Sequence, residues 1–200
     1  MAERLLGALN PHFDGLRSIR HAVRGRLDPA VRKLTDVSWE NWQPIDRATL
    51  LFVVQDKRVL LIRKKRGLGA GKINAPGGRL ERGERPAPGA IRESEEELLI
   101  TPGGLVKHGE LSFQFVDGYS IFVHVFRASN YRGEPTETEE ATPHWTHVDE
   151  IPYQEMWADD ALWVPILLKR GFFSGRFLFD DEVMLDYQLD ELRDATRLGE

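Results

Sequence analysis

The chain has 200 residues, of which 41% are hydrophobic and 30% charged, a balance that fits a soluble globular protein with one core and a small appendage. No apolar run approaches the roughly 20 residues of a membrane-spanning helix, and the net charge of −5 argues against stable nucleic-acid binding by the whole chain. Cysteine is absent, which excludes disulfides and thiolate zinc sites and makes the cytoplasm the default location.

Residues 1–46 are predicted to form an N-terminal helical extension. Apolar residues recur at spacings of three and four over 16–27, and a second pattern over 28–34 begins with an Asp-Pro pair, typical of a helix start. We therefore expect two short amphipathic helices. The basic face of the first is interpreted as solvated, with a dimer contact or an organellar transit peptide as alternatives. Trp39 and Trp42 are expected to anchor the extension, because aromatic side chains bury a large area.

The main domain is predicted over 47–192, with a tail over 193–200. It begins with a hairpin, whose strands over 48–54 and 58–63 are joined by a turn. The next segment, 64–72, combines four basic side chains with three glycines that let the backbone approach a ligand closely. It is not a P-loop, because Ile73 stands where that motif requires Ser or Thr. It is either an anion-binding loop or an ordinary mobile basic loop.

A dense carboxylate cluster lies on the next predicted element, a helix that begins near 86–88. Glu93, Glu96 and Glu97 are spaced i, i+3 and i+4, so all three project from one helical face. Like charges at this spacing destabilise a helix by roughly 0.2–0.5 kcal/mol per pair. We therefore expect a hard divalent cation here, shared with a phosphate-bearing ligand.

The last third of the chain is predicted to contain strands and one helix. Strands are predicted over 111–115, 119–126, 145–148, 176–179 and 183–189, with a polar loop over 133–142. A helix is predicted from Trp157 through Leu168, with Asp159 or Asp160 as its N-cap. Capping accounts for only one of these two adjacent carboxylates.

These features together describe a nucleotide site. A carboxylate helix, a Gly-Gly loop ahead of it and a basic loop suit phosphates, whereas the aromatic residues around the paired acid suit a ring. A divalent metal would neutralise phosphate charge and lower the pKa of a water, and a spare carboxylate could take the proton.

One spaced set of residues resembles the signature of the Nudix hydrolases. Its members are Gly78, Glu84, Arg92, Glu93, Glu96 and Glu97, with the family's intervals of five, seven and two residues. There are two departures from the pattern, because Ser94 fills an apolar position and Leu99 fills the last glycine. Leu99 is expected to alter how the helix ends, since that glycine would serve as a left-handed cap.

The resemblance extends beyond the signature, over about 49–189, to the mammalian MutT homologues, the oxidised purine nucleoside triphosphatases. The matching positions include Lys64-Lys65-Arg66-Gly67, Asn74, Gly77-Gly78, Met156-Trp157, Asp159-Asp160, Trp163 and Leu185-Asp186-Tyr187. The resemblance implies an α/β (α+β) fold, the Nudix α/β/α sandwich with a mixed central sheet. It also implies hydrolysis of nucleotides such as 8-oxo-dGTP to the monophosphate and pyrophosphate, in a monomer or homodimer.

The resemblance also implies roles for individual residues. Magnesium, or manganese in its place, would be held by Gly77, Glu93, Glu96, Glu97 and Glu140. Glu97 or Glu96 would be the base, and Arg92 would brace the carboxylates. The nucleotide pocket would consist of Asn74, Asp159, Asp160, Trp157, Phe113, Thr49 and Lys64, with Leu68 where the relatives have phenylalanine.

The resemblance gives the acid pair a physical explanation. Two neighbouring carboxylates in an apolar pocket cannot both ionise cheaply, so one is expected to donate a hydrogen bond while the other accepts. Two alternatives remain at this point. The first is a Nudix hydrolase for ADP-ribose or a methylated purine nucleotide, and the second is a Nudix domain that binds nucleotide without hydrolysing it.

Overall fold

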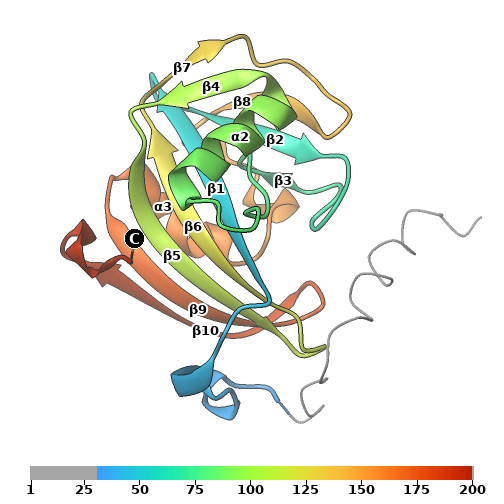
Figure 1. The fold of residues 1–200 in the computed structure, drawn as a ribbon, viewed down its shortest axis with the longest axis vertical. Coiled ribbons are helices and arrows are strands. Elements are labelled where there is room, and N and C mark those ends of the chain that lie inside the picture. Colours follow the sequence, from blue (N-terminus) through green and yellow to red (C-terminus); the bar gives the residue numbers. More distant parts are fainter. Residues whose placement is uncertain (1–30, 200) are drawn as a thin grey trace, which may run out of the picture.

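The computed structural model describes residues 31–199. Apolar residues form a continuous run in β1 (Asp46–Gln55), and the middle of this strand is buried on both faces. Leu51 joins the apolar cluster that contains Leu98 of α2 (Pro86–Leu98), whereas Phe52 meets Trp163 of α3 (Asp160–Leu168) edge-on, with ring centroids 5.6 Å apart. Figure 1 shows α2 in front of the sheet and α3 behind it. This arrangement confirms the predicted α/β/α sandwich.

The central sheet is mixed and, among the described residues, has eight strands. Seven run in the order β10-β9-β5-β6-β1-β2-β3, and β8 pairs with the other edge of β2. Their bounds are β2 Arg58–Lys64, β3 Ile73–Asn74, β5 Val106–Phe115, β6 Ser120–Ala128, β8 Ala141–His147, β9 Phe172–Asp180 and β10 Val183–Leu192. The β1–β6 and β5–β9 pairs are parallel, and the other pairs are antiparallel.

All the predicted strands are present, but the two-residue strand β3 was not predicted, and a further pair of strands was missed as well. The turn of the first hairpin has positive φ at both Asp56 and Lys57, as a two-residue turn with matching twist requires. The missed pair comprises β4 (Ile100–Gly103) and β7 (Asn130–Gly133), which pair antiparallel as a small separate sheet beside α2. Both are short and contain glycine, and β4 also contains proline, so neither carries a clear alternation.

The helix α2 begins at Pro86 as predicted, but the expectation about its end was wrong. Leu99 adopts the left-handed conformation, with φ 59° and ψ 31°, and its N–H donates to the Glu95 carbonyl at 3.0 Å. The helix therefore ends in the cap that glycine would form. Leu99 is 59% exposed, so no packing opposes this conformation. The cost is a backbone strain of about 1–2 kcal/mol, because a left-handed residue with a Cβ is strained.

The described part of the N-terminal extension contains no α-helix, so the helix predicted over 28–34 is absent from its described residues, 31–34. The chain forms two 3-10 turns, η1 (Leu34–Asp36) and η2 (Trp39–Asn41), after an extended Lys33. The Asp36 carboxylate accepts from the backbone N–H groups of Arg32 and Lys33 at 3.0 and 2.9 Å, and such local bonds compete with helix formation. The predicted helix over 16–27 lies outside the described residues.

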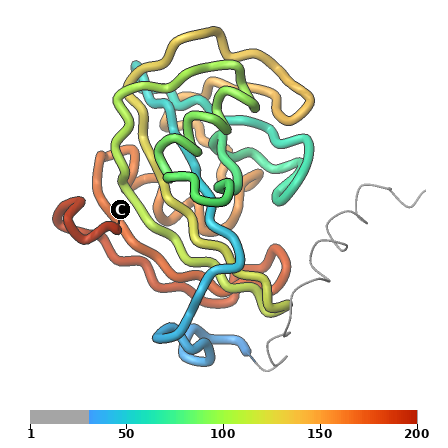
Figure 2. Tube along the Cα trace, viewed as in Figure 1, coloured from blue at the N-terminus to red at the C-terminus, as the bar shows by residue number. Residues whose placement is uncertain are grey.

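The two tryptophans do anchor the extension. Trp42 Nε1 donates to Gln114 Oε1 of β5 at 2.9 Å, and Trp39 packs in a cluster with Leu178 of β9. Figure 2 shows this segment in blue against the β9–β10 end of the domain. Short 3-10 turns also occur at η3 (Tyr153–Glu155) and, in the tail, at η4 (Ala195–Arg197).

Candidate active site

The Gly77-Gly78 loop lies directly against the carboxylates of α2. Gly77 N–H donates to Glu97 Oε2 at 2.8 Å. A Cβ added to Gly77 would lie 2.1 Å from the Thr49 carbonyl oxygen, and one on Gly78 would lie 2.3 Å from Glu93 Oε2. Gly77 therefore excludes any side chain, because its neighbour is backbone and its φ is +157°, whereas a side chain at Gly78, the glycine of the signature, would displace the Glu93 carboxylate.

Glu97 is buried, with 2% of its surface exposed. Its Oε1 accepts from Lys64 Nζ at 3.1 Å, and the same ammonium donates to the Gly77 carbonyl at 3.2 Å. Burial raises the pKa of Glu97 above its ordinary value, and the charge of Lys64 opposes that rise.

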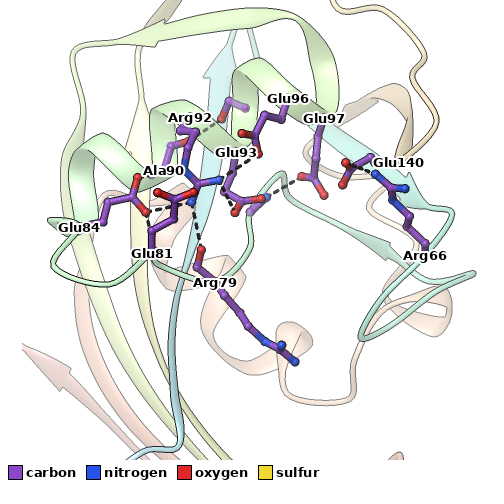
Figure 3. Close-up of polar contacts among 12 residues, drawn as sticks. Arg66, Arg79, Glu81, Glu84, Ala90, Arg92, Glu93, Glu96, Glu97 and Glu140 are labelled. Carbon is purple, nitrogen blue, oxygen red and sulfur yellow. Dashed lines mark hydrogen bonds and ion pairs between the residues drawn. The ribbon is translucent and has the colours of Figure 1, made fainter. Parts of the chain in front are cut away.

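Arg92 ties the other carboxylates together, as Figure 3 shows. Its Nε and Nη2 donate to the two oxygens of Glu84, both at 2.9 Å, and its Nη1 donates to Glu93 Oε1 and Glu96 Oε2, also at 2.9 Å. Nη2 also donates to the Arg79 carbonyl at 3.0 Å. These hydrogen bonds lower the pKa of Glu84, whereas burial raises the pKa of Glu93. The guanidinium is therefore placed as a brace between the loop and the helix.

No three Asp, Glu, His or Cys side chains among residues 31–199 are grouped closely enough to hold a metal ion in this arrangement. The five predicted ligands each contact a basic side chain instead. Glu93 and Glu96 accept from Arg92, Glu97 and the Gly77 carbonyl accept from Lys64, and Glu140 accepts from Arg66.

The chemistry of these donors nevertheless fits a hard divalent cation. All five are carboxylate or carbonyl oxygens, the ligands that Mg²⁺ prefers. The ammonium of Lys64 is itself a cation that two of these oxygens hold in common, which shows that Glu97 and Gly77 converge on one cation-binding position.

A cavity of about 580 Å³ brings most of the predicted residues together. All eight predicted pocket residues line it: Thr49, Lys64, Leu68, Asn74, Phe113, Trp157, Asp159 and Asp160. The predicted metal ligands Gly77, Glu93, Glu97 and Glu140 line it too, but Glu96 and Arg92 do not. Its volume lies in the range of pockets that bind small molecules, which is about 300–1,000 Å³.

The aromatic part of the cavity is rigidly packed. The Phe113 ring stacks on Phe177 with centroids 5.2 Å apart, and Trp157 meets Phe179 edge-on at 5.7 Å. Lys72 Nζ lies 5.1 Å from the Trp157 ring centroid, within cation–π range. Within the described part of the chain, Thr49 Oγ1 is buried and has no hydrogen-bond partner, so it is free to bond a ligand.

The acid pair is buried, with Asp159 and Asp160 each 2% exposed. Asp159 stands at the N-cap position of α3, but neither side chain caps the helix. Trp163 Nε1 donates to Asp159 Oδ2 at 2.8 Å, and the Trp157 N–H donates to Asp160 Oδ2 at 3.0 Å. Burial raises the pKa of Asp159 to about 6, and burial together with the charge of Asp159 raises that of Asp160 well above its ordinary value.

Sequence reasoning missed another cluster, of which Tyr119 and Arg79 line the same cavity. The Tyr119 hydroxyl donates to Asp46 Oδ2 at 2.9 Å, and Arg79 Nε lies 3.0 Å from the same oxygen. Burial and this carboxylate raise the pKa of Tyr119 to about 12. These residues are far apart in the sequence, and no motif links them. Arg66 was also not predicted as a site residue, although it lies in the basic loop 64–72 that was considered as an anion-binding loop.

A NUDIX domain matches residues 44–166 of the chain. The chain belongs to the Nudix family. This Nudix protein is 46% identical over 148 residues to the oxidized purine nucleoside triphosphate hydrolase of Danio rerio, a match that covers 73% of this chain and 95% of the relative. The protein of the same name from Mus musculus is 44% identical over 146 residues, with 72% and 94% covered.

A solved structure agrees with these matches. The MutT protein from Bacillus halodurans has a TM-score of 0.65 and 29% sequence identity to this Nudix chain, and the match covers 73% of this chain and 98% of the other. The similarity therefore extends over the whole domain of that relative.

Proposed function

We propose that the chain hydrolyses oxidised purine nucleoside triphosphates such as 8-oxo-dGTP to the monophosphate and pyrophosphate, and so removes damaged nucleotides from the precursor pool. The observation that carries the proposal is the buried pair Asp159 and Asp160, which shares one cavity with Glu93 and Glu97. The names of the two relatives that match over most of their length also support it.

The acid pair suits the edge of an oxidised purine. Because burial raises both pKa values, the pair holds a proton more readily than exposed carboxylates do, so one carboxyl would donate and the other accept. The keto oxygen and ring N–H of the oxidised base offer the matching acceptor and donor. Trp157 and Phe113 would flank the ring, while Asn74, Thr49 and Lys64 would complete the pocket beside Leu68.

The phosphate chemistry belongs to the carboxylate side of the cavity. Gly77, Glu93, Glu96, Glu97 and Glu140 would hold Mg²⁺, or Mn²⁺ in its place. The bound ion would neutralise phosphate charge and lower the pKa of the attacking water. Glu97 or Glu96 would take the proton of that water, and the raised pKa of Glu97 favours proton acceptance. Arg92 would keep the Glu93 and Glu96 carboxylates in position.

The test compares pyrophosphate release from 8-oxo-dGTP and dGTP in Asp159→Asn and Asp160→Asn. We expect at least one of the two variants to lose about tenfold in the ratio of kcat/KM values, because a hydrogen bond to a charged partner contributes roughly 1.5–3 kcal/mol. Asp149→Asn, whose side chain is 84% exposed, is the matched control. Unchanged discrimination in both pocket variants would contradict the proposal.

The same assay separates the alternatives. A higher kcat/KM for ADP-ribose or a methylated purine nucleotide than for 8-oxo-dGTP would identify that compound as the substrate instead. Glu97→Gln is expected to abolish product formation, and turnover equal to that of wild type would exclude Glu97 as the base.

Within residues 31–199, no helix is long and apolar enough to span a membrane. We propose a cytoplasmic monomer or homodimer.

A further inference from the structure

The basic loop 64–66 contacts the carboxylate site at two separate places. Lys64 Nζ lies between Glu97 Oε1 and the Gly77 carbonyl, at 3.1 and 3.2 Å. This contact is shielded from solvent, since the Lys64 and Glu97 side chains are 16% and 2% exposed. A lysine ammonium therefore fills the position in which those two oxygens would hold a metal ion.

Arg66 makes the second contact, at the rim of the cavity. Its Nη2 donates to Glu140 Oε1, and the two side chains are 62% and 36% exposed. The backbone supports this pair, because the Lys65 N–H donates to the Glu140 carbonyl oxygen at 2.8 Å. Figure 3 shows Arg66 reaching Glu140 beside Glu97. Lys64 and Arg66 line the cavity, as does Lys65 between them.

The neighbouring Lys65 differs from these two residues. Its Nζ pairs with Glu137 Oε1 at 2.6 Å, an exposed carboxylate that is not a proposed metal ligand and does not line the cavity. Three consecutive basic residues thus pair with three acidic groups, of which only Glu97 and Glu140 belong to the proposed metal site. This difference provides a matched control.

A divalent ion would compete with these two side chains for the same oxygens. Mg²⁺ binds its oxygen ligands at about 2.0–2.1 Å, so its entry brings a double positive charge against the ammonium and the guanidinium. The ion would therefore weaken the contacts of Lys64 with Glu97 Oε1 and the Gly77 carbonyl, and the contact of Arg66 with Glu140 Oε1. Arg92 differs, because it also donates to Glu84 and to the Arg79 carbonyl, which are not proposed metal ligands. Lys64 and Arg66 lie on a cavity that would receive the phosphate chain, whose oxygens accept strong charge-assisted hydrogen bonds from lysine and arginine.

We propose that Lys64 and Arg66 are resident counter-ions of the metal ligands, and that metal entry transfers both side chains to the substrate phosphates. Metal and triphosphate then bind cooperatively, and by linkage each ligand strengthens the other by the same factor. The inference rests on the proposed function in one respect, because it takes Gly77, Glu97 and Glu140 as metal ligands.

The first experiment measures Mn²⁺ binding to nucleotide-free protein, by the electron paramagnetic resonance signal of the unbound ion. We expect Arg66→Ala to bind Mn²⁺ about two- to five-fold more tightly than wild type, because an exposed ion pair that competes for Glu140 is removed. Lys64→Met is expected to tighten binding further, since the pair that it removes is buried. Lys65→Ala should leave the Mn²⁺ affinity unchanged.

The second experiment measures the phosphate contact in the presence of metal. We expect Arg66→Ala to raise the KM for the triphosphate about tenfold, the loss of a charge-assisted hydrogen bond, with Arg66→Lys restoring most of it. The affinity for the nucleoside 8-oxo-2′-deoxyguanosine, which has no phosphate, should not change. An equal loss of nucleoside affinity would overturn the transfer to phosphate.

The failures of the two proposals are distinguishable. Wild-type protein that binds no Mn²⁺ would overturn the metal site of the proposed function, and this inference with it. Wild-type binding combined with unchanged or weaker Mn²⁺ affinity in both Arg66→Ala and Lys64→Met would overturn the counter-ion role alone. If Lys65→Ala tightened Mn²⁺ binding as much as Arg66→Ala, the effect would come from the total charge of the loop. That result would also overturn the counter-ion role.

Discussion

Asp159 and Asp160 show how much of the site depends on single residues and their surroundings. Each carboxyl has one oxygen held by a tryptophan N–H, and both are buried between aromatic side chains. The local pattern explains one of the two acids as a cap, and the resemblance to the Nudix family led us to expect a pair that shares a proton. The structure shows the burial of both side chains, which raises both pKa values and so favours a shared proton.

This burial predicts a pH dependence of stability. Because the folded pKa of Asp159 is raised from 3.8 to about 6, the folded state binds more protons than the unfolded state in that window. Stability contributed by the pair is therefore present at low pH and lost as pH rises through the folded pKa values. We expect Asp160→Asn to be more stable than wild type at pH 7, by on the order of 1–3 kcal/mol.

Urea unfolding at pH 7 and at pH 4.5 checks this prediction. The gain should shrink at the lower pH, because wild type then carries its protons as well. The asparagine Oδ1 can still accept from the Trp157 N–H, so that hydrogen bond is not lost. Asp149→Asn, at an exposed position, should show neither effect. A less stable Asp160→Asn at pH 7 would contradict the assignment of a costly buried charge.

At the scale of elements, α2 carries the site because both its ends are set locally. Proline begins the helix, and Leu99 ends it in a left-handed conformation that glycine adopts without strain. Ser94, the other departure from the signature, is buried and donates to the Ala90 carbonyl oxygen at 2.8 Å, so its hydroxyl is satisfied within the helix. Neither departure disturbs the face that presents Glu93 and Glu97.

The cap of α2 can be tested by substitution. We expect Leu99→Gly to raise the free energy of unfolding by about 0.5–1 kcal/mol, the relief of left-handed strain less the extra chain entropy of glycine. Leu99→Ala keeps the strain and should change stability by less than about 0.5 kcal/mol. Thermal unfolding of both variants distinguishes the cases, and equal stability of the glycine and alanine variants would show that the cap is unstrained.

At the scale of the whole molecule, the sheet order assembles the cavity. Asn74 lies on β3, Thr49 on β1 and Phe113 on β5, and the parallel pairing of β1 with β6 brings these strands into one sheet. The two apolar clusters on either face hold this sheet between α2 and α3. The proposed metal ligands lie outside both clusters and contact Lys64, Arg66 and Arg92, so we expect the fold not to depend on an ion.

Metal removal should therefore separate activity from folding. We expect a chelator to abolish turnover while the far-ultraviolet circular dichroism spectrum stays unchanged. Restoring Mg²⁺ to about five times its Kd should add only about 1 kcal/mol of stability, by mass action. Loss of secondary structure on chelation would contradict the view that protein side chains balance the carboxylates in the metal-free state.

The sequence by itself determined the features that depend on local spacing. The hairpin, the carboxylate face of α2 and the Nudix signature follow from periodicity or from short intervals between residues. The candidate pocket residues follow from the resemblance to the Nudix family. Only the tertiary structure decided the parallel strand pairs, the β4–β7 sheet, the cluster of Asp46, Arg79 and Tyr119, and the counter-ions at Glu97 and Glu140. These depend on contacts between distant segments and on burial, which set partners and pKa values that no local pattern records.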